Sequence, residues 1–224
     1  MIAEEKDLIA LPNELSYADG AQVACGFGTV YEAIEKIQLN GHALLITGLG
    51  PVGLAAAALS RKIGVQLIIG IDVVHERLRL ADSLKSCDVV LKAGADNVHE
   101  VKELTGGFGV ERAIDCSANA IARTTAIRAT RKWGKIAFVG EGGTVEFHPS
   151  PHIIHDQKTI YGSWVTSTWL MEELVARLTR WNLHPADIIT HRFGLEDAAN
   201  AYALTAAGKC GKVAVCSDEE LAIK

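Results

Sequence analysis

The sequence has no excess of basic residues, and this absence limits the partners it can have. Its 224 residues include 22 Lys and Arg against 27 Asp and Glu, for a formal net charge of −5 at pH 7. Binding to nucleic acid or to anionic membranes generally requires a basic surface. We therefore expect neither as a partner. An apolar share of 49% with 22% charged residues is typical of globular proteins and excludes disordered, collagenous and coiled-coil chains.

Paired cysteines are also absent. The five cysteines form no C-x-x-C motif and are odd in number. Cys210 and Cys216 flank a strand-like run, which would hold them about 20 Å apart and exclude a disulfide between them. The start of the sequence lacks the charged-then-apolar layout of a signal peptide. Together these features predict a reducing cytoplasm.

Long uninterrupted hydrophobic runs are missing as well. The stretch His42–Ser60 carries no Asp, Glu, Lys or Arg, but three glycines and Pro51 lie in its middle. A membrane-spanning helix would need about 20 consecutive apolar residues. A strand, a turn and a helix are therefore favoured over a membrane span. No internal repeat and no low-complexity linker is present.

From residue 42 onward, short apolar runs alternate with longer amphipathic ones. We expect strands at Ala43–Thr47, Gln66–Ile71, Asp88–Leu91, Arg112–Asp115, Lys135–Val139 and Thr159–Val165. Helices are expected near 52–63, 75–85, 96–104 and 119–130, then at Thr168–Trp181 and Leu195–Ala207, before a last strand at Lys212–Cys216. The strands are apolar almost throughout, as strands buried on both faces should be. The predicted class is α/β, a doubly wound, mostly parallel sheet with helices on both faces.

The strongest chemical signal is the glycine-rich segment that follows the first strand. It has the spacing G-x-G-x-x-G and leads into an Ala-rich helix. The first glycine permits a tight turn, the second a close approach to a pyrophosphate, and the third close contact between helix and strand. The predicted phosphate-binding residues are Gly48, Gly50, Pro51, Val52 and Gly53.

An acidic residue completes this fingerprint. Asp72 follows the second strand, 24 residues after Gly48. Its carboxylate can accept hydrogen bonds from both ribose hydroxyls, whereas a 2′-phosphate there would meet like charge. NAD is therefore favoured over NADP. Arg77 is a candidate to cover the adenine, or else a solvated side chain.

Two other interpretations of the glycine segment stay open. It could be a turn with a capping aspartate and no ligand, or an adenosyl-methionine site, in which a glycine turn and a ribose-binding acid also occur. The third glycine at Gly53 and the long Ala-rich helix favour a dinucleotide.

Several further motifs follow in order along the chain. They are Glu76–Leu78, Glu103–Gly107, Ala113–Ser117, Trp133–Lys135, Tyr161–Ser163 and Gly211–Val213. With the glycine segment and Asp72, this set resembles the cofactor-binding half of zinc-type medium-chain alcohol dehydrogenases, the group that includes sorbitol and threonine dehydrogenases. The resemblance covers nearly the whole chain. It implies a Rossmann fold, NAD as cofactor, an alcohol or carbonyl compound as substrate, and hydride transfer between alcohol and NAD.

The resemblance also implies roles for individual residues. Cys25 falls where the family places one cysteine ligand of the catalytic zinc, and Thr29 where a threonine lies near the nicotinamide. Cofactor contacts are implied for Cys116, Gly140 and Glu141. One departure is Ala118, which stands where many relatives have glycine; we expect this change to be harmless.

By the same resemblance, residues 16–184 form a complete NAD-binding domain. Residues 1–15 and 185–224 would belong to an N-terminal, barrel-like catalytic domain that has no counterpart in this sequence. The remaining zinc ligands of the family lie on that domain, and one cysteine cannot hold a catalytic zinc. We therefore expect zinc only in a full-length form, Cys25 to be an orphan ligand and a buried small residue, and this chain alone to be inactive.

The segment Thr159–Val165 is the expected edge of the sheet. By resemblance it would pair with the same segment of a second copy, related by two-fold symmetry, in a homodimer. This pairing is physically reasonable because Trp164 and Trp169 would otherwise be exposed beside an unpaired apolar edge. The alternative is an edge covered by its own chain.

Three histidines invite a metal hypothesis but are better explained as part of a polar loop. His148, His152 and His155 stand four and three residues apart, yet two prolines interrupt any helix that could bring them together.

Two other functions remain open at this stage. The chain could be a stand-alone, non-catalytic module that binds NAD(H) or docks to a partner. It could also be a relative of zinc-independent quinone or enone reductases, although Asp72 argues against their usual preference for NADPH.

Overall fold

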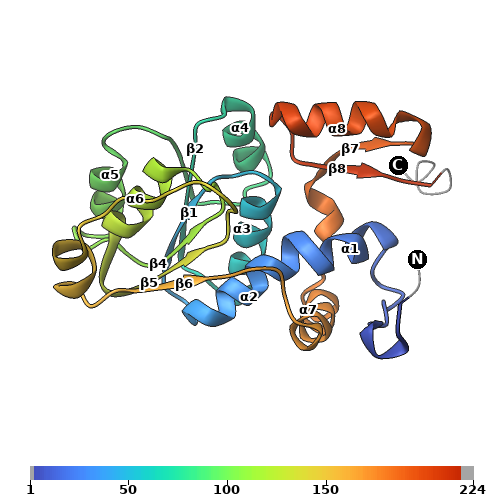
Figure 1. Cartoon of the computed structure of the whole chain (residues 1–224), viewed down its shortest axis with the longest axis horizontal. Helices are drawn as coiled ribbons and strands as arrows, with labels where there is room; N and C mark the ends of the chain where they lie inside the picture. The colour runs from blue at the N-terminus through green and yellow to red at the C-terminus, as the bar shows by residue number, and fades with distance from the viewer. Residues whose placement is uncertain (1–2, 218–224) are drawn as a thin grey trace.

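A computed structural model describes residues 3–217 and contains one six-stranded parallel sheet. The strand order is β3-β2-β1-β4-β5-β6 (Figure 1). The strands are β1 (Ala43–Thr47), β2 (Leu67–Asp72), β3 (Val89–Lys92), β4 (Val110–Asp115), β5 (Thr130–Phe138) and β6 (Thr159–Gly162). This is the order of the doubly wound dinucleotide-binding folds, so the predicted class is confirmed.

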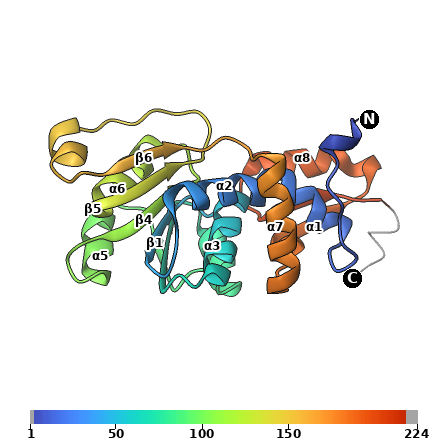
Figure 2. The same ribbon diagram turned by 90° about the horizontal axis from the view of Figure 1, so that it is seen from below.

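Helices cover both faces of the sheet (Figures 1 and 2). The described helices are α1 (Tyr17–Gln22), α2 (Gly28–Ile37), α3 (Pro51–Ile63), α4 (His75–Ser83), α5 (Asn97–Leu104), α6 (Ala120–Ala129), α7 (Thr168–Trp181) and α8 (Ala198–Ala207), of which α8 packs on a separate pair of strands. Within β1, Leu44 and Ile46 join the core that includes residues of α2, α3 and α7, while Leu45 joins the core that includes residues of α5 and α6. Because each face of the strand is covered, β1 is apolar from Ala43 to Ile46.

Several predicted elements have different limits in the structure. The edge strand ends at Gly162 instead of Val165, because the backbone leaves the ladder and Val165 adopts φ +50°. Helix α8 is shorter than expected, since Leu195–Asp197 forms a separate 3-10 turn. Helices α1 and α2 were not predicted. Helix α2 nevertheless has a clear apolar face, on which Val30, Ile34 and Ile37 are fully or almost fully buried.

The stretch His42–Ser60 contains β1, the glycine turn and the first part of α3. Within residues 3–217, none of the helices has the length and apolar character needed to cross a membrane.

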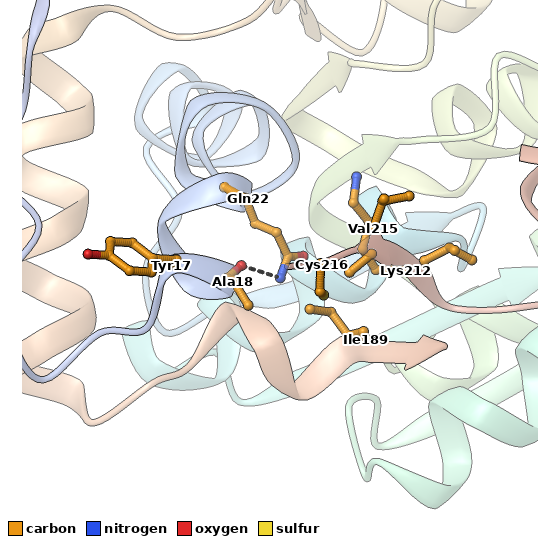
Figure 3. A pocket seen from close by; sticks show the side chains of 10 residues that line it. Tyr17, Ala18, Gln22, Ile189, Lys212, Val215 and Cys216 are labelled. Carbon is orange, nitrogen blue, oxygen red and sulfur yellow. Dashed lines mark hydrogen bonds between the residues drawn. The ribbon is translucent and has the colours of Figure 1, made fainter. Parts of the chain in front are cut away.

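The end of the chain forms a second, two-stranded parallel sheet, β7 (Ile189–Phe193) with β8 (Lys212–Val215), connected through α8. In Figure 1 it lies beside α4 and α1, away from β6. A cavity of about 210 Å³ separates α1 from this sheet (Figure 3), and Tyr17, Gln22 and Cys216 are among its lining residues. Gln22 spans part of the gap by donating from Nε2 to the Pro185 carbonyl at 2.7 Å.

Asp19 fastens α1 to the segment before β7. Its carboxylate accepts the backbone and hydroxyl hydrogens of Ser16 at 2.9 and 2.7 Å, and the backbone N–H of Ala186 at 2.8 Å. Burial alone would raise the pKa of this carboxyl, but the hydrogen bonds from Ala186 and Ser16 outweigh it and hold the pKa below its usual value of 3.8. Ionised Asp19 therefore stabilises the fold.

We predict that Asp19→Asn lowers the free energy of unfolding at pH 7 by about 1–3 kcal/mol, because charge-assisted hydrogen bonds are lost. The folded-state pKa is depressed, so this stabilisation exists above the unfolded pKa and disappears as pH falls through the folded one. Urea unfolding between pH 7 and pH 3 should show the gap between the two proteins narrowing in acid. The exposed Asp82→Asn is the control, and a gap that does not change with pH contradicts the assignment.

Candidate functional site

The carboxyl ends of β1 and β4 lie side by side at the centre of the sheet. In the register, Thr47 pairs with Ile71 on one side and with Asp115 on the other. The next residue, Gly48, donates its N–H to the Ile71 carbonyl at 2.8 Å, and the Thr47 carbonyl accepts the N–H of Cys116 at 2.8 Å. Chain connections depart in opposite directions from these two strands, which makes this edge the topological switch point where doubly wound sheets bind ligands.

Two glycines of the loop are required by the protein itself. Gly48 has φ +88°, and a Cβ on it would lie 2.8 Å from the Cβ of Ser117. A Cβ on Gly53 would overlap the carbonyl oxygen of Gly48. A tight turn and a close helix approach therefore explain both positions without any ligand.

Gly50 differs from these two. Its backbone is extended, with φ −68° and ψ −173°, a conformation open to any residue. A Cβ there would meet only the Arg77 guanidinium, at 3.7 Å. Helix α3 begins at the next residue, Pro51, without a side-chain cap, so the N–H groups of its first turn are available. None of the described residues, 3–217, requires glycine at position 50.

Asp72 ends β2 and is almost fully buried. Its carboxylate accepts the N–H of Leu49 at 2.7 Å and that of Val74 at 2.8 Å. The acid therefore holds the glycine loop in place, which is the capping role that the sequence left open as an alternative. A carboxylate has about four lone-pair positions, so it can accept further hydrogen bonds besides these two.

Arg77 reaches back from α4 over this loop. Its Nη1 lies 3.6 Å from Oδ2 of Asp72, and its Nη2 would lie 2.9 Å from a Cβ on Gly208, the residue that ends α8. The Nε atom is buried and has no hydrogen-bond partner within the described part of the chain. The structure thus places Arg77 beside Gly50.

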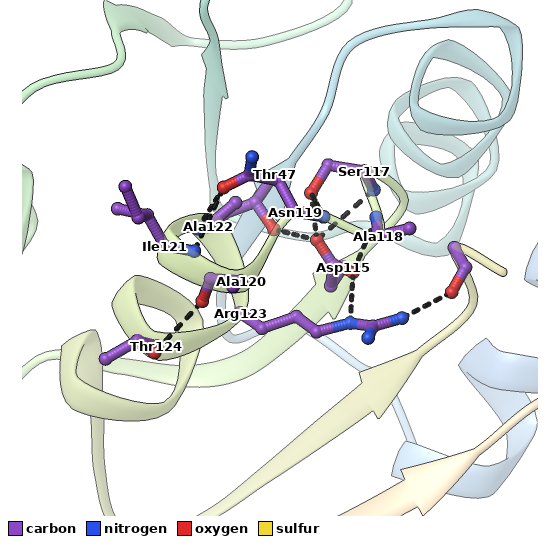
Figure 4. A network of polar contacts seen from close by, with 11 residues as sticks. Thr47, Asp115, Ser117, Ala118, Asn119, Ala120, Ile121, Ala122, Arg123 and Thr124 are labelled. Atoms are coloured by element: carbon purple, nitrogen blue, oxygen red, sulfur yellow. Dashed lines mark hydrogen bonds and ion pairs between the residues drawn. The ribbon is translucent and has the colours of Figure 1, made fainter. Parts of the chain in front are cut away.

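A second buried carboxylate, Asp115, lies at the end of β4 (Figure 4). Its Oδ1 accepts the hydroxyls of Thr47 and Ser117 at 2.8 and 2.6 Å, and its Oδ2 accepts the N–H of Ala118 at 3.1 Å. Arg123 donates from Nε to the same Oδ2 at 3.2 Å. Sequence reasoning missed this network, because its members are joined only by the fold.

The remaining residues implied by the family resemblance reach the same edge. Burial and the nearby Asp115 raise the pKa of the Cys116 thiol, which stays protonated at neutral pH. Gly140 follows β5 and donates its N–H to the Asp115 carbonyl at 3.0 Å, and Glu141 is exposed beside it. The carbonyl of Thr29, near the start of α2, accepts the hydroxyl of Ser163 after β6 at 3.5 Å.

Two exposed apolar side chains at this edge were not singled out from sequence. Val73 follows β2 and is 71% exposed, and Ile121 in the first turn of α6 is 76% exposed.

Cys25 is exposed, not buried as expected, because it lies on the outer side of the π-helical turn Val23–Phe27. Among residues 3–217, no three His, Cys, Asp or Glu side chains are grouped so that they could hold a metal. A catalytic zinc requires three protein ligands, so the described residues do not fit a complete zinc site.

Comparison with known proteins identifies the family. Residues 51–180 match the family described as zinc-binding dehydrogenase, and the chain belongs to that family. The zinc-type alcohol dehydrogenase-like protein YphC of Escherichia coli (strain K12) is 47% identical over 217 residues, which are 96% of this chain and 61% of the relative. L-threonine 3-dehydrogenase of Coxiella burnetii is 29% identical over 222 residues, 95% of this chain and 62% of the relative.

Solved structures agree with this assignment. A structure described as NAD-dependent alcohol dehydrogenase superposes with a TM-score of 0.82 at 25% identity, and covers 96% of this chain and 63% of the other. The chain thus spans about three-fifths of the length of the relatives that it matches.

Ala118 adopts φ +60°, the left-handed region that favours glycine. We predict that Ala118→Gly stabilises the protein by about 0.5–1 kcal/mol, because the strain of a Cβ in this conformation exceeds the extra freedom of glycine in the unfolded chain. Chemical denaturation measures the difference. Ala122→Gly, within α6, is the control and should destabilise by a similar amount. Loss of stability in Ala118→Gly would mean that the alanine is not strained.

Proposed function

We propose that this chain is the NAD(H)-binding part of a zinc-dependent alcohol or polyol dehydrogenase. The observation that carries the proposal is Gly50, which the protein's own packing does not require and which lies at the uncapped N-terminus of α3. A pyrophosphate against this backbone supplies the missing reason, since helix N-termini favour anions. The solved NAD-dependent alcohol dehydrogenase that superposes on this chain supports the choice of cofactor.

In this proposal the dinucleotide lies across the carboxyl edge of the sheet. The pyrophosphate contacts the backbone of Gly50, Val52 and Gly53, and the adenosine ribose bonds to Asp72. The adenine lies beside the exposed side chain of Val73, the residue that follows β2. Asp72 is nearly buried at the end of β2, where an acidic side chain disfavours a 2′-phosphate and favours NAD over NADP.

The nicotinamide half extends toward the ends of β4 and β5. Cys116, Gly140 and Glu141 lie there, and Thr29 approaches from α2. Bound NAD supplies the hydride-transfer chemistry, taking a hydride from the carbinol carbon of an alcohol. The residues of this chain bind the cofactor and orient it. No step is assigned to zinc, because Cys25 is the one family ligand position present and the described residues complete no site.

The terminal segments are proposed to belong to a second domain. A two-stranded parallel sheet such as β7–β8 is unusual in isolation, because parallel strands are normally buried in larger sheets. The cavity between α1 and β8, and the exposed side chains of Leu8, Tyr17 and Val215, mark surfaces that a further domain would cover. We propose that residues 16–184 are the cofactor domain and that 1–15 and 185–224 are parts of the second domain. Residues 218–224 lie outside the described range.

We also propose a homodimer formed through β6. This strand is the last in its sheet, and beyond it Trp164 and Trp169 are 65% and 73% exposed. Pairing with the same strand of a second copy would satisfy the free backbone groups and cover the indoles.

Gly50→Val is predicted to weaken NADH binding by at least about 100-fold while leaving the fold intact, because the added side chain occupies the space of the pyrophosphate. NADH fluorescence titration measures the affinity, and thermal unfolding reports stability. Gly41→Val is the matched control, since this glycine precedes the opposite end of β1 and a Cβ on it meets only atoms at 3.6 Å or more. Equal affinities for wild type and Gly50→Val would refute the proposed site.

The wild type should bind NADH about tenfold or more tightly than NADPH.

Trp164→Glu is predicted to raise the dimer dissociation constant by about tenfold or more, because it places a charge beside the paired edge. Sedimentation velocity over a range of concentrations measures it. Trp133→Glu, at an indole that is 68% exposed near the start of the sheet's inner strand β5, is the control. A wild type that remains monomeric at high concentration contradicts the dimer.

A further inference from the structure

We propose that the buried pair Asp115–Arg123 positions the nicotinamide half of the cofactor site. The inference rests on the proposed NAD(H) site and adds two residues to it that touch no part of the cofactor. Both are positioning residues. They hold the connection after β4 and the connection after β5 in place, and in the proposed site both connections border the nicotinamide.

Arg123 joins these two connections through different nitrogen atoms. Its Nε donates to Oδ2 of Asp115 at 3.2 Å, and its Nη2 donates to the Gly140 carbonyl at 2.6 Å (Figure 4). The guanidinium also lies 5.2 Å from the ring centroid of Phe138, the last residue of β5. The planar guanidinium presents its donors in a fixed fork, which lets one side chain hold both partners at once. A lysine in the same place has a single nitrogen.

The turn after β4 depends on the carboxylate for its shape. Oδ1 of Asp115 accepts the Ser117 hydroxyl, and Oδ2 accepts the N–H of Ala118, whose backbone is left-handed. Two glycines of the neighbouring connection pack directly on this turn: a Cβ on Gly140 would overlap the N of Ala118, and one on Gly143 would overlap its carbonyl oxygen. A shift of Ala118 is therefore transmitted to residues 140–143.

The adenosine half has a separate support. Asp72 holds the glycine loop and the start of the β2–α4 connection through Leu49 and Val74. Within residues 3–217 no hydrogen bond or ion pair joins Asp72 to Arg123. Asp115 also accepts the Thr47 hydroxyl beside the glycine loop, whereas the side chain of Arg123 donates to Asp115 and to the Gly140 carbonyl, on the β4 and β5 side of the site. A change at Arg123 that leaves Asp115 in place should therefore affect the nicotinamide half more than the adenosine half.

This separation can be measured with two ligands. ADP-ribose carries the adenosine, the pyrophosphate and the second ribose but no nicotinamide ring, whereas NADH carries all four groups. We predict that Arg123→Lys raises the dissociation constant for NADH by about tenfold and that for ADP-ribose by less than about twofold. Calorimetric titration of the whole chain gives both constants. The emission of bound NADH, which reports the surroundings of the nicotinamide, should move toward that of free NADH.

A matched control lies at the other end of α6. Lys158 is buried, pairs with Asp156 at 3.0 Å and donates to the Ile127 carbonyl at 2.9 Å. Lys158→Met therefore also breaks a buried ion pair, away from the carboxyl edge of the sheet. It should lower thermal stability while leaving the ratio of the NADH and ADP-ribose constants unchanged. Ser117→Ala, which removes one hydrogen bond from Asp115, replaces Arg123→Lys as the test variant if the latter does not fold.

The outcomes separate the two proposals. A wild type that binds ADP-ribose and NADH, with a variant that loses affinity for NADH alone, supports the positioning pair. Equal weakening of both ligands, or of neither, overturns it while the NAD(H) site stands. A wild type that binds neither ligand overturns the proposed function and this inference with it.

Discussion

Strand β1 is hydrogen-bonded to β2 on one side and to β4 on the other, and its last residue, Thr47, faces Ile71 and Asp115 across these two ladders. Because the register is fixed by side chains that are buried on both faces, the three strands end together. Their ends place two carboxylates, Asp72 and Asp115, on either side of the glycine turn. The pairing of β1 with β2 and β4 thus determines where the glycine turn and the two carboxylates of the proposed cofactor site lie.

Much of this arrangement could be predicted from sequence because it depends on local patterns. The limits of β1 and α7 were predicted correctly, since each is a continuous apolar or amphipathic run with clear stop signals. The glycine spacing and the acid that follows β2 are likewise local. Helix α1 was missed because it is short, and the pairing of β7 with β8 because it joins segments about 20 residues apart with weak alternation.

Two features required the three-dimensional structure. Arg123 is eight residues from Asp115 in sequence, but its second partner, Gly140, lies in the connection after β5 and is adjacent only in the fold. The change to alanine at position 118 was expected to be harmless. The structure gives this residue a left-handed backbone, so the substitution carries a steric cost that the size of the side chain does not reveal.

The glycines of the loop also carry an evolutionary consequence. Gly48 and Gly53 are maintained by the requirement for a stable fold. Almost any substitution at either position would damage the fold, and selection against misfolded protein would remove it. Gly50 has no such protection. A single nucleotide change converts a glycine codon to one for alanine or valine, and at this position the product would still fold. Under the proposed function, binding of the dinucleotide maintains this residue, and a copy of the gene released from that requirement would be expected to lose Gly50 before it loses its structure.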